Sequence, residues 1–325
     1  MQTTRRRFLA GSTLLGLYPT VALAQAPWPS RAIRVISGGS PGGSSDIFVR
    51  ILESRLRERL GQPLFIDNRP GAGGMTAAGI AASSPPDGHT LFVSNLATNA
   101  IGLALYAKPT FDPKKDLPPV ARMSTMSNAI VVRSDSGINT LQELIVHMKA
   151  NPKKAFYGSA GVGTSSHLTG HLFSSRIGVE GVHVPYKGTA ANLNALLAGE
   201  VLFAADNMPL YVQHVKGGAL RLLAVTQAQR VAGYPDVPTV QEFGGIGAFD
   251  VFSWYGLSAS TGTPPAIVDR LGSEVVAALA DPTIQAAVRA VGAEPAALSP
   301  TAYGAFIDAE IRKWTPIVKA SGAVV

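Results

Sequence analysis

Two glycine- and serine-rich loops contain the residue types best suited to binding an anion. Each follows a short apolar strand pattern and leads into a helix pattern. The first runs Gly38-Gly-Ser-Pro-Gly-Gly-Ser-Ser45, before a helix beginning at Asp46, and the second runs Gly158-Ser-Ala-Gly-Val-Gly-Thr-Ser-Ser166. Glycine lets backbone approach a ligand closely, and a helix N-terminus offers unpaired N–H groups with a partial positive charge. Two such loops, far apart in sequence, predict an anion held between two halves of the protein.

Asp46 and Asp206 are the acidic candidates for a ligand site. Asp46 lies in the first turn of its helix, where it either accepts a hydrogen bond from a ligand or stabilises the helix dipole. Asp206 follows the strand expected over 201–205 and has the same two roles, with ligand contact favoured because strand ends face the cleft. The hydroxyl groups of both loops either donate to a carboxylate or cap their helices, and both roles can hold at once.

The first loop also matches the G-x-S-x-G pattern of a hydrolase, because Ser40 lies between Gly38 and Gly42. A nucleophile elbow needs the backbone N–H of the residue after the serine for its oxyanion hole. That residue is Pro41, which has no N–H. A secreted serine esterase using Ser40 is therefore kept only as an alternative.

His167 and His171 are spaced i, i+4, as a zinc pair on a helix would be. The glutamate of an H-E-x-x-H motif is missing, because residue 168 is leucine, and the sequence offers no third ligand. We therefore expect His167 to order the second loop and His171 to be exposed. That loop is neither a Walker A loop nor G-x-G-x-x-G, so the sequence predicts no metal and no cofactor.

Strand and helix patterns alternate along the chain after Trp28. This order predicts βαβ units with parallel strands, whose ligands bind at the carboxyl ends of the strands. A capping box, Thr140-x-x-Glu143, opens one further helix. The expected strands are 33–37, 64–67, 90–94, 129–133, 155–158, 182–184, 201–205 and 220–226, and the other expected helices are 46–60, 75–82, 165–177, 189–198, 264–280, 283–291 and 300–320.

The two α/β units and the returning C-terminal segment predict two lobes joined by two crossings, near residues 123–128 and 230–240. We expect lobe 1 to comprise 25–125 plus 237–325, and lobe 2 to comprise 126–236.

The first 24 residues have the features of a cleaved export signal. Thr4-Arg-Arg-Arg-Phe-Leu9 is a twin-arginine pattern, and Ala22-Leu-Ala24 is a small-x-small cleavage site. The apolar stretch between them contains proline and glycine and is short for a membrane anchor. We therefore predict a periplasmic protein with a Tat-like signal, although the same segment could use the Sec pathway.

Charge and cysteine content narrow the classes of partner. Removing 1–24 deletes three arginines and no acids, so the net charge of +7 falls to +4. This mild excess is not clustered with aromatic residues, which argues against nucleic-acid binding and suits an acidic small molecule. The chain has no cysteine, which excludes disulfides, thiolate metal sites and a lipid-modified N-terminal cysteine.

A series of motifs spans the whole mature chain in the order of one known family. The motifs are Arg31-Ala-Ile-Arg-Val, Pro41-Gly-Gly-x-x-Asp46, Asn68-Arg-Pro-Gly-Ala-Gly-Gly74, Pro86-Asp-Gly-x-Thr-Leu91, Tyr157-Gly-Ser-Ala-Gly-x-Gly-Thr164, His183-Val-Pro-Tyr-Lys-Gly188, Pro235-Asp-Val-Pro-Thr239 and Trp254-x-Gly256. The chain closely resembles the Bug family, the periplasmic solute receptors of tripartite tricarboxylate transporters.

This resemblance implies a monomeric α/β protein with a two-lobed periplasmic-binding-protein fold of type II, each lobe a mostly parallel sheet flanked by helices. It also implies a cleft that closes on a small organic acid. Carried over residue by residue, it favours these ligand-binding positions: Ser40, Gly43, Ser44, Asp46, Thr98, Ser159, Gly163, Thr164 and Asp206. The chain departs from the family at Gly38-Gly39, where the family usually has Pro-Phe, and this predicts a looser and roomier first loop.

The function that the resemblance implies is a non-catalytic receptor that delivers an organic acid to membrane transporter subunits. The same fold also serves receptors that report a ligand to a membrane sensor kinase, and the sequence does not separate the two.

Overall fold

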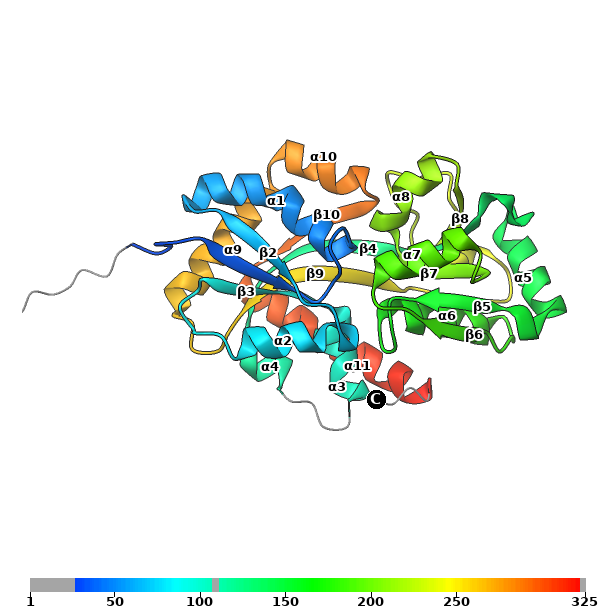
Figure 1. The fold of residues 1–325 in the computed structure, drawn as a ribbon, viewed down its shortest axis with the longest axis horizontal. Helices are drawn as coiled ribbons and strands as arrows, with labels where there is room; N and C mark the ends of the chain where they lie inside the picture. Colours follow the sequence, from blue (N-terminus) through cyan, green and yellow to red (C-terminus); the bar gives the residue numbers. More distant parts are fainter. Residues whose placement is uncertain (1–26, 107–110, 322–325) are drawn as a thin grey trace, which may run out of the picture.

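One long strand, β4 (Pro119–Arg133), passes through both halves of the molecule and organises the fold (Figure 1). The computed structural model describes residues 27–106 and 111–321, so the predicted export signal lies outside the described residues. The described strands form a 10-stranded sheet in the order β2-β1-β3-β9-β4-β7-β5-β6, and β8 and β10 also pair with β4. In this order, β4 lies between the two halves of the sheet and belongs to both.

The first half of the sheet combines parallel and antiparallel strands. β1 pairs in parallel with β2 and β3, and β9 lies antiparallel between β3 and β4. Its strands are β1 (Ile33–Ser37), β2 (Leu64–Asn68), β3 (Thr90–Asn95), β9 (Phe252–Ala259) and β10 (Ala293–Leu298). Its helices are α1 (Ser44–Leu60), α2 (Met75–Ala82), α3 (Gly102–Leu105), α4 (Pro113–Asp116), α9 (Pro265–Leu279), α10 (Pro282–Ala290) and α11 (Pro300–Ala320).

The second half of the sheet also combines parallel and antiparallel strands. β5 pairs in parallel with β6 and β7, while β7 and β8 are antiparallel to the last residues of β4. Its strands are β5 (Phe156–Ser159), β6 (Val182–Pro185), β7 (Phe203–Asn207) and β8 (Leu220–Val225). Its helices are α5 (Leu141–Ala150), α6 (Ser165–Arg176), α7 (Thr189–Ala198) and α8 (Met208–Lys216).

Helix α1 shows how the sequence positions one of the two glycine-rich loops. Its buried face packs Phe48, Leu52 and Leu56 at helical spacing into the core. The helix ends at Gly61, whose φ of +72° is the left-handed conformation typical of a helix C-terminus. The buried face therefore fixes the direction in which the N-terminus of α1 points.

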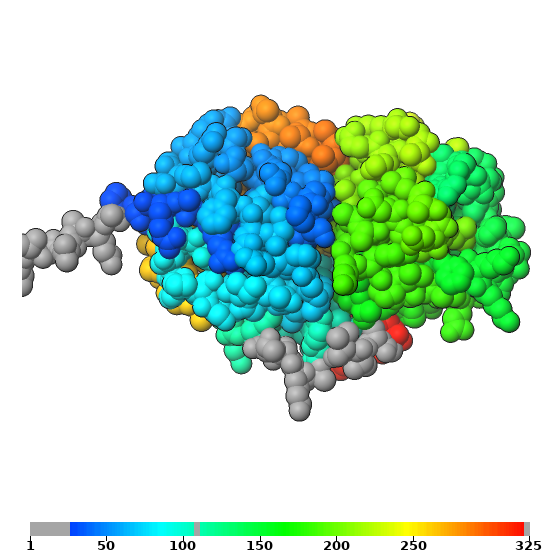
Figure 2. All heavy atoms as spheres, in the orientation of Figure 1, coloured from blue at the N-terminus to red at the C-terminus, as the bar shows by residue number. Residues whose placement is uncertain are grey.

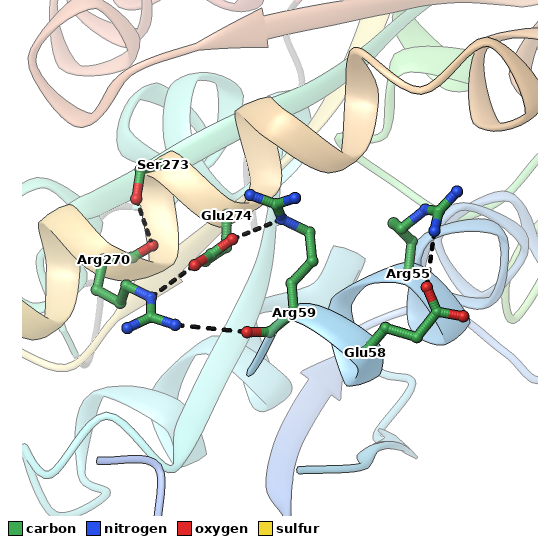
Figure 3. A network of polar contacts seen from close by, with 6 residues as sticks. All are labelled: Arg55, Glu58, Arg59, Arg270, Ser273 and Glu274. Carbon is green, nitrogen blue, oxygen red and sulfur yellow. Dashed lines mark hydrogen bonds and ion pairs between the residues drawn. The ribbon is translucent and has the colours of Figure 1, made fainter. Parts of the chain in front are cut away.

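A polar network joins the C-terminal end of α1 to α9 (Figure 3). Glu274 on α9 accepts from the Nε atoms of Arg59 and Arg270, each at 2.6 Å, and Arg270 also donates to the Arg59 carbonyl. Arg55 pairs with Glu58 at 2.7 Å and with Asp281 at the start of α10. These contacts fasten the end of α1 that lies away from the cleft.

The two halves connect through a buried polar cluster. At the junction in β4, Ser127 pairs with Phe252 on β9, and the next residue, Asn128, pairs with Asn207 on β7. Thr226 donates its N–H to Ser127 Oγ at 2.8 Å and its hydroxyl to the Val251 carbonyl at 2.7 Å. The cluster thus links both chain crossings, and Figure 2 shows the two halves meeting along one seam.

The two-lobed α/β fold class predicted from the sequence is confirmed. The expectation that each lobe has a mostly parallel sheet is wrong, because all the described strands that pair with β4 are antiparallel to it. The sequence analysis missed β9, β10, α8 and the first part of β4, whose partners are distant in the chain. The helix expected at the capping box is present, with Thr140 Oγ accepting from the Glu143 N–H. The Glu143 carboxylate, however, accepts from the N–H of Asn139 rather than from that of Thr140.

Within the described ranges, none of the helices has the length and hydropathy needed to cross a bilayer.

Candidate functional site

A cavity of about 510 Å³ lies between the two halves of the protein, at the carboxyl ends of the parallel strands. One part of its wall comes from the loops after β1, β2 and β3 and from β9, and the other part from the loops after β5, β6 and β7. The wall residues are Gly38, Gly39, Ser45, 70–74, Asn95, Ala97, Tyr106, 160–162, 164–166, 186–189, Asp206, Asn207, Ser253 and Tyr255.

The first glycine-rich loop brings the N-terminus of α1 to this cavity. Gly43 is the N-cap and makes no side-chain cap, and Ser45 in the first turn lines the wall. The first N–H groups of a helix have no partner within the helix. Ser37 Oγ lies 2.9 Å from Ser45 Oγ and accepts from the Gly39 N–H at 3.2 Å, so the loop is tied back to its own strand. The arrangement leaves backbone donors available for an anion.

Gly38 and Gly39 are tightly packed, which corrects the expectation of a looser loop. A Cβ at position 38 would lie 2.5 Å from the Cα of Gly74, and a Cβ at position 39 would collide with Ser45 Oγ. Real Cβ atoms do not approach other atoms so closely, so a side chain at 38 would require backbone at Gly74 to move, and one at 39 would require the Ser45 hydroxyl to move. Backbone of the loop after β2 occupies the place that a side chain at 38 would take.

The second glycine-rich loop is held by its own hydrogen bonds. Thr164 is the N-cap of α6: its Oγ1 accepts from the His167 N–H at 3.4 Å and donates to the Gly161 carbonyl at 2.7 Å. Ser159 Oγ accepts from the Gly161 N–H at 3.1 Å, and Ser166 Oγ accepts from the Ala160 N–H at 2.9 Å. The N–H groups of residues 162, 165 and 166 take no part in these bonds.

Helix N-termini surround the cavity. In the described part of the chain, α1, α2, α6, α7 and α8 each have a wall residue at the N-cap or in the first turn: Ser45, Gly74, Thr164, Gly188 and Asn207. For α1, α2, α7 and α8, the described residues provide no side-chain cap. Each N-terminus carries roughly half a positive charge, so these helices contribute partial positive charge to the wall without arginine side chains.

Lys187 and Asp206 are the charged residues that the described chain contributes to the wall. Asp206 is 1% exposed and accepts from the Asn207 N–H at 2.7 Å, from Asn192 Nδ2 at 2.8 Å and from the Tyr211 hydroxyl at 3.3 Å. Burial raises the pKa of the Asp206 carboxyl, and these hydrogen bonds oppose the rise. A carboxyl with a raised pKa opposes an anionic ligand less than an ordinary aspartate does.

Asp46 is placed differently from Asp206. Its carboxylate is buried and accepts from Arg50 Nε at 2.8 Å and from the Gly42 N–H at 3.1 Å. It lies outside the wall of the cavity. Both partners of the Asp46 carboxylate thus lie within the protein, and they tie the first loop to α1.

Two hydrogen bonds cross the cleft between the two halves. Ser40 Oγ donates to the Lys187 carbonyl at 3.5 Å, and a Cβ on the neighbouring Gly188 would lie 2.6 Å from that same oxygen. On another side, Asn207 Nδ2 donates to the Tyr255 hydroxyl at 3.1 Å. Glycine at 188 therefore allows the two walls to approach each other.

The structure brings the predicted site residues into one region but places only some of them in the wall. Thr164 and Asp206 line the cavity. Ser40 makes a contact across the cleft, and the remaining predicted positions lie directly behind the wall, in the loops or first turns that support it: Gly43, Ser44, Asp46, Thr98, Ser159 and Gly163. Thr98 is fully buried, and its hydroxyl donates to Asn99 Oδ1 at 2.7 Å.

Sequence reasoning missed much of the wall, namely residues 70–74, Tyr106, 186–189, Ser253 and Tyr255. A signal was present for two of these segments, because residues 70–74 and 186–189 follow the parallel strands β2 and β6 and so end at the same edge as the two chosen loops. For Ser253 and Tyr255 the signal was lacking, because they lie on the unpredicted strand β9.

The surroundings of Ser40 and His167 concern two alternatives raised by the sequence, a serine esterase and a metal site. An esterase serine needs a base in hydrogen-bond reach, whereas the hydrogen bond of Ser40 Oγ in the described structure goes to a backbone carbonyl. His167 Nδ1 accepts from the Gly163 N–H at 3.2 Å, which is the loop-ordering role considered from the sequence. In the described residues, no group of three or more His, Cys, Asp or Glu side chains is placed to hold a metal ion.

Comparison with known sequences relates the chain to one family. Residues 48–323 match the family described as "Tripartite tricarboxylate transporter family receptor". The chain is 37% identical over 325 residues to a protein encoded in the gbd 5′ region of Cupriavidus necator, with 98% of each chain covered. It is 33% identical over 316 residues to protein BugT of Bordetella pertussis, covering 95% of this chain and 97% of that one.

Solved structures show the same relationship. "R. palustris Rpa4515 with adipate" has a TM-score of 0.88 and 33% identity, covering 91% of this chain and 98% of that one. The periplasmic binding protein BugD has a TM-score of 0.86 and 31% identity, covering 91% and 99%. "MatC (Rpa3494) from Rhodopseudomonas palustris with bound malate" has a TM-score of 0.82 and 31% identity, covering 90% and 100%.

Proposed function

This chain belongs to the tripartite tricarboxylate transporter receptor family, and from that premise we propose that it captures a small organic carboxylate between its two lobes and delivers it to the membrane subunits of such a transporter. The observation that carries the proposal is the cavity between the two halves with helix N-termini in its wall. Backbone N–H groups at helix N-termini bind carboxylates because they combine hydrogen-bond donors with a partial positive charge.

The ligand contacts both lobes in this proposal. The N-terminus of α1 belongs to one half and that of α6 to the other, so a carboxylate between them is gripped fully only when the cleft is closed. Binding therefore favours the closed state by hinge motion. A micromolar Kd corresponds to about −8 kcal/mol, which several charge-assisted hydrogen bonds and burial of the ligand can supply.

The proposal includes the boundaries of the two lobes, the export signal and the residues that face the ligand. Lobe 1 comprises 25–125 plus 237–325, and lobe 2 comprises 126–236. Residues 1–24 are a cleaved export signal that directs the protein to the periplasm. Relatives with adipate and malate bound support an organic acid as the ligand. The loops after β1 and β5 hold one carboxylate, while Asn95, Asp206 and Tyr255 face the remainder of the ligand.

The proposal is tested first by ligand-induced thermal stabilisation. The mature protein is unfolded and refolded to remove carried-over ligand, then heated with malate, adipate, citrate, glutamate or benzoate. Ligand at roughly a hundred times its Kd adds about 2.7 kcal/mol to the free energy of unfolding, which raises Tm by several degrees. We expect at least one organic acid to stabilise the protein. If the whole panel leaves Tm unchanged, the carboxylate-receptor proposal fails for these classes.

Delivery to a transporter needs a separate experiment. Cells that lack the gene are compared with wild-type cells for uptake of the radiolabelled acid that gave the largest thermal shift. We expect uptake to fall in the deletion strain and to return when the mature protein is supplied in the periplasm. Normal uptake in the deletion strain, combined with clear binding in vitro, would instead favour a sensory receptor.

A further inference from the structure

Two histidines lie directly behind the second glycine-rich loop. His167 is in the first turn of α6, and His183 is on β6. Their rings stack with centroids 3.9 Å apart and an angle of 21° between the planes. Tyr157 on β5 also stacks with His183, with ring centroids 5.1 Å apart. Tyr157 and His183 are paired in the parallel register of β5 and β6, so the sheet itself places these two rings side by side.

Each imidazole holds one end of the loop. His167 Nδ1 accepts from the Gly163 N–H at 3.2 Å, and His183 Nε2 lies 2.6 Å from Ser159 Oγ. Ser159 Oγ in turn accepts from the Gly161 N–H at 3.1 Å. The acceptor role of Nδ1 requires that His167 carries no proton on this nitrogen. The two rings therefore fix both ends of the segment 159–163.

The bonds made by the imidazoles decide which N–H groups remain for a ligand. Gly161 and Gly163 have φ values of +132° and +75°, so the loop depends on conformations that few residues adopt. With the N–H groups of Gly161 and Gly163 turned inward, those of residues 162, 165 and 166 are the donors at this corner of the cavity. A loop that lost its inward bonds would present its donors in varying directions.

We propose that His167 and His183 are positioning residues, which hold the loop 159–166 in its anion-binding conformation as a stacked pair of neutral imidazoles. The inference rests on the proposed function, because it takes this loop to be a carboxylate site. It goes beyond that function by assigning the geometry of the loop to two side chains that lie outside the cavity wall.

The first test reads the loop without any ligand. Amide hydrogen exchange is measured by NMR in the wild type, in His167→Leu and in His167→Asn, whose side-chain oxygen can take the place of Nδ1. We expect exchange of the Gly163 amide to rise about tenfold in His167→Leu and to stay near the wild-type rate in His167→Asn. His171→Leu is the matched control, because His171 lies one turn further along α6.

The second test reads binding. Adipate is titrated calorimetrically into the same proteins and into the pair His183→Ala and His183→Gln, where glutamine can replace Nε2. We expect Kd to rise about tenfold in His167→Leu and His183→Ala, and to rise much less in the Asn and Gln variants and in the His171→Leu control. Unchanged loop exchange in His167→Leu and His183→Ala would overturn the inference, whatever the ligand.

The two proposals can fail separately. If the wild type binds none of the organic acids but the loop exchange behaves as expected, the proposed function fails and the positioning role stands. If the leucine variant does not fold, the nitrogen chemical shifts of the His167 ring in the wild type decide the matter. A proton on Nδ1 at neutral pH would overturn the inference.

Discussion

The stacked histidines predict how the stability of the protein depends on pH. Burial, with a smaller contribution from neighbouring imidazoles, lowers the pKa of His167 to about 4 and that of His183 to about 3, against an ordinary value of 6.5. The titratable groups around the pair are Tyr157 on β5 and His171 on α6. Between about pH 4 and pH 6.5, the unfolded chain therefore binds two protons, one on each histidine, that the folded protein does not bind.

The difference between the folded-state and unfolded-state pKa values of the two histidines sets how the free energy of unfolding changes with pH. Because each folded-state pKa is depressed, the stabilisation from each neutral histidine is complete above pH 6.5 and is lost as the pH falls towards the folded-state values. Between pH 7.5 and pH 5.0, each histidine removes about 2 kcal/mol from the free energy of unfolding, and the pair removes about 4 kcal/mol. Two unit charges about 4 Å apart would repel by about 4 kcal/mol in a medium like a protein surface, which explains why the rings resist joint protonation.

Urea unfolding, followed by circular dichroism at pH 7.5 and pH 5.0, measures this loss. Wild type is compared with the double variant His167→Asn/His183→Gln, whose amide side chains do not titrate. We expect the double variant to lose about 4 kcal/mol less than the wild type over this interval. Ordinary carboxyl groups stay mostly ionised in this window, so they contribute little to the difference.

An equal loss in the two proteins would refute the reasoning, because it would mean that the two rings titrate alike in the folded and unfolded states. Histidine proton resonances in the folded wild type give a direct check. If His167 and His183 take up protons near pH 6.5, the stacked pair is not held neutral, and the linkage argument fails.

Three further predictions concern the cavity and its supports. Gly188→Ala should weaken carboxylate binding at least about tenfold, as measured by calorimetry, because the new Cβ would lie 2.6 Å from Ser40 Oγ across the cleft. Gly178→Ala is the control, since Gly178 has a similar positive φ but open space around it. Asp206→Asn should lower the free energy of unfolding by about 1–3 kcal/mol, because in either orientation the amide N–H₂ takes the place of one oxygen that accepts from a buried N–H, that of Asn207 or that of Asn192. Urea unfolding measures the change, and unaltered stability would contradict the network. Glu274→Ala should lower the free energy of unfolding by about 1 kcal/mol, because the buried Glu274 carboxylate loses its contacts with two partly exposed arginines, Arg59 and Arg270. A thermal melt with unchanged Tm would show that the network adds nothing.

The sequence predicted the parts of the site whose signals are local. The loops after β1 and β5 combine glycine, serine and a following helix within about ten residues, so each could be recognised without knowledge of its neighbours. The role of Asp46 could not be decided in this way. The partners that the structure gives it, Arg50 Nε and the Gly42 N–H, depend on how the loop folds onto the helix, and a ligand contact at Asp46 stays a prediction.

Strand β9 was missed for a different reason. The segment Phe252–Ala259 mixes aromatic, glycine and serine residues and is buried along nearly its whole length, so it lacks the alternation of an exposed strand. It becomes a strand because β3 and β4, both distant in the chain, pair with it on either side. Ser253 and Tyr255 therefore entered the cavity wall through tertiary pairing, which no short window of sequence contains.

The construction of the wall also explains how such a site combines affinity with adaptability. In the function proposed above, its anion donors are backbone N–H groups at helix N-termini, which need little ordering when the ligand arrives and which no substitution other than one to proline removes. The shape of the cavity is set separately, by close backbone packing such as that of Gly38 on Gly74 and by side chains such as Tyr106 and Tyr255. Substitutions at these shaping positions change which acid fits while the donors stay in place. The approach of Gly74 to Gly38 means that the ligand space of this chain is set jointly by the loops after β1 and β2, so a side chain restored at position 38 would require the loop after β2 to move as well.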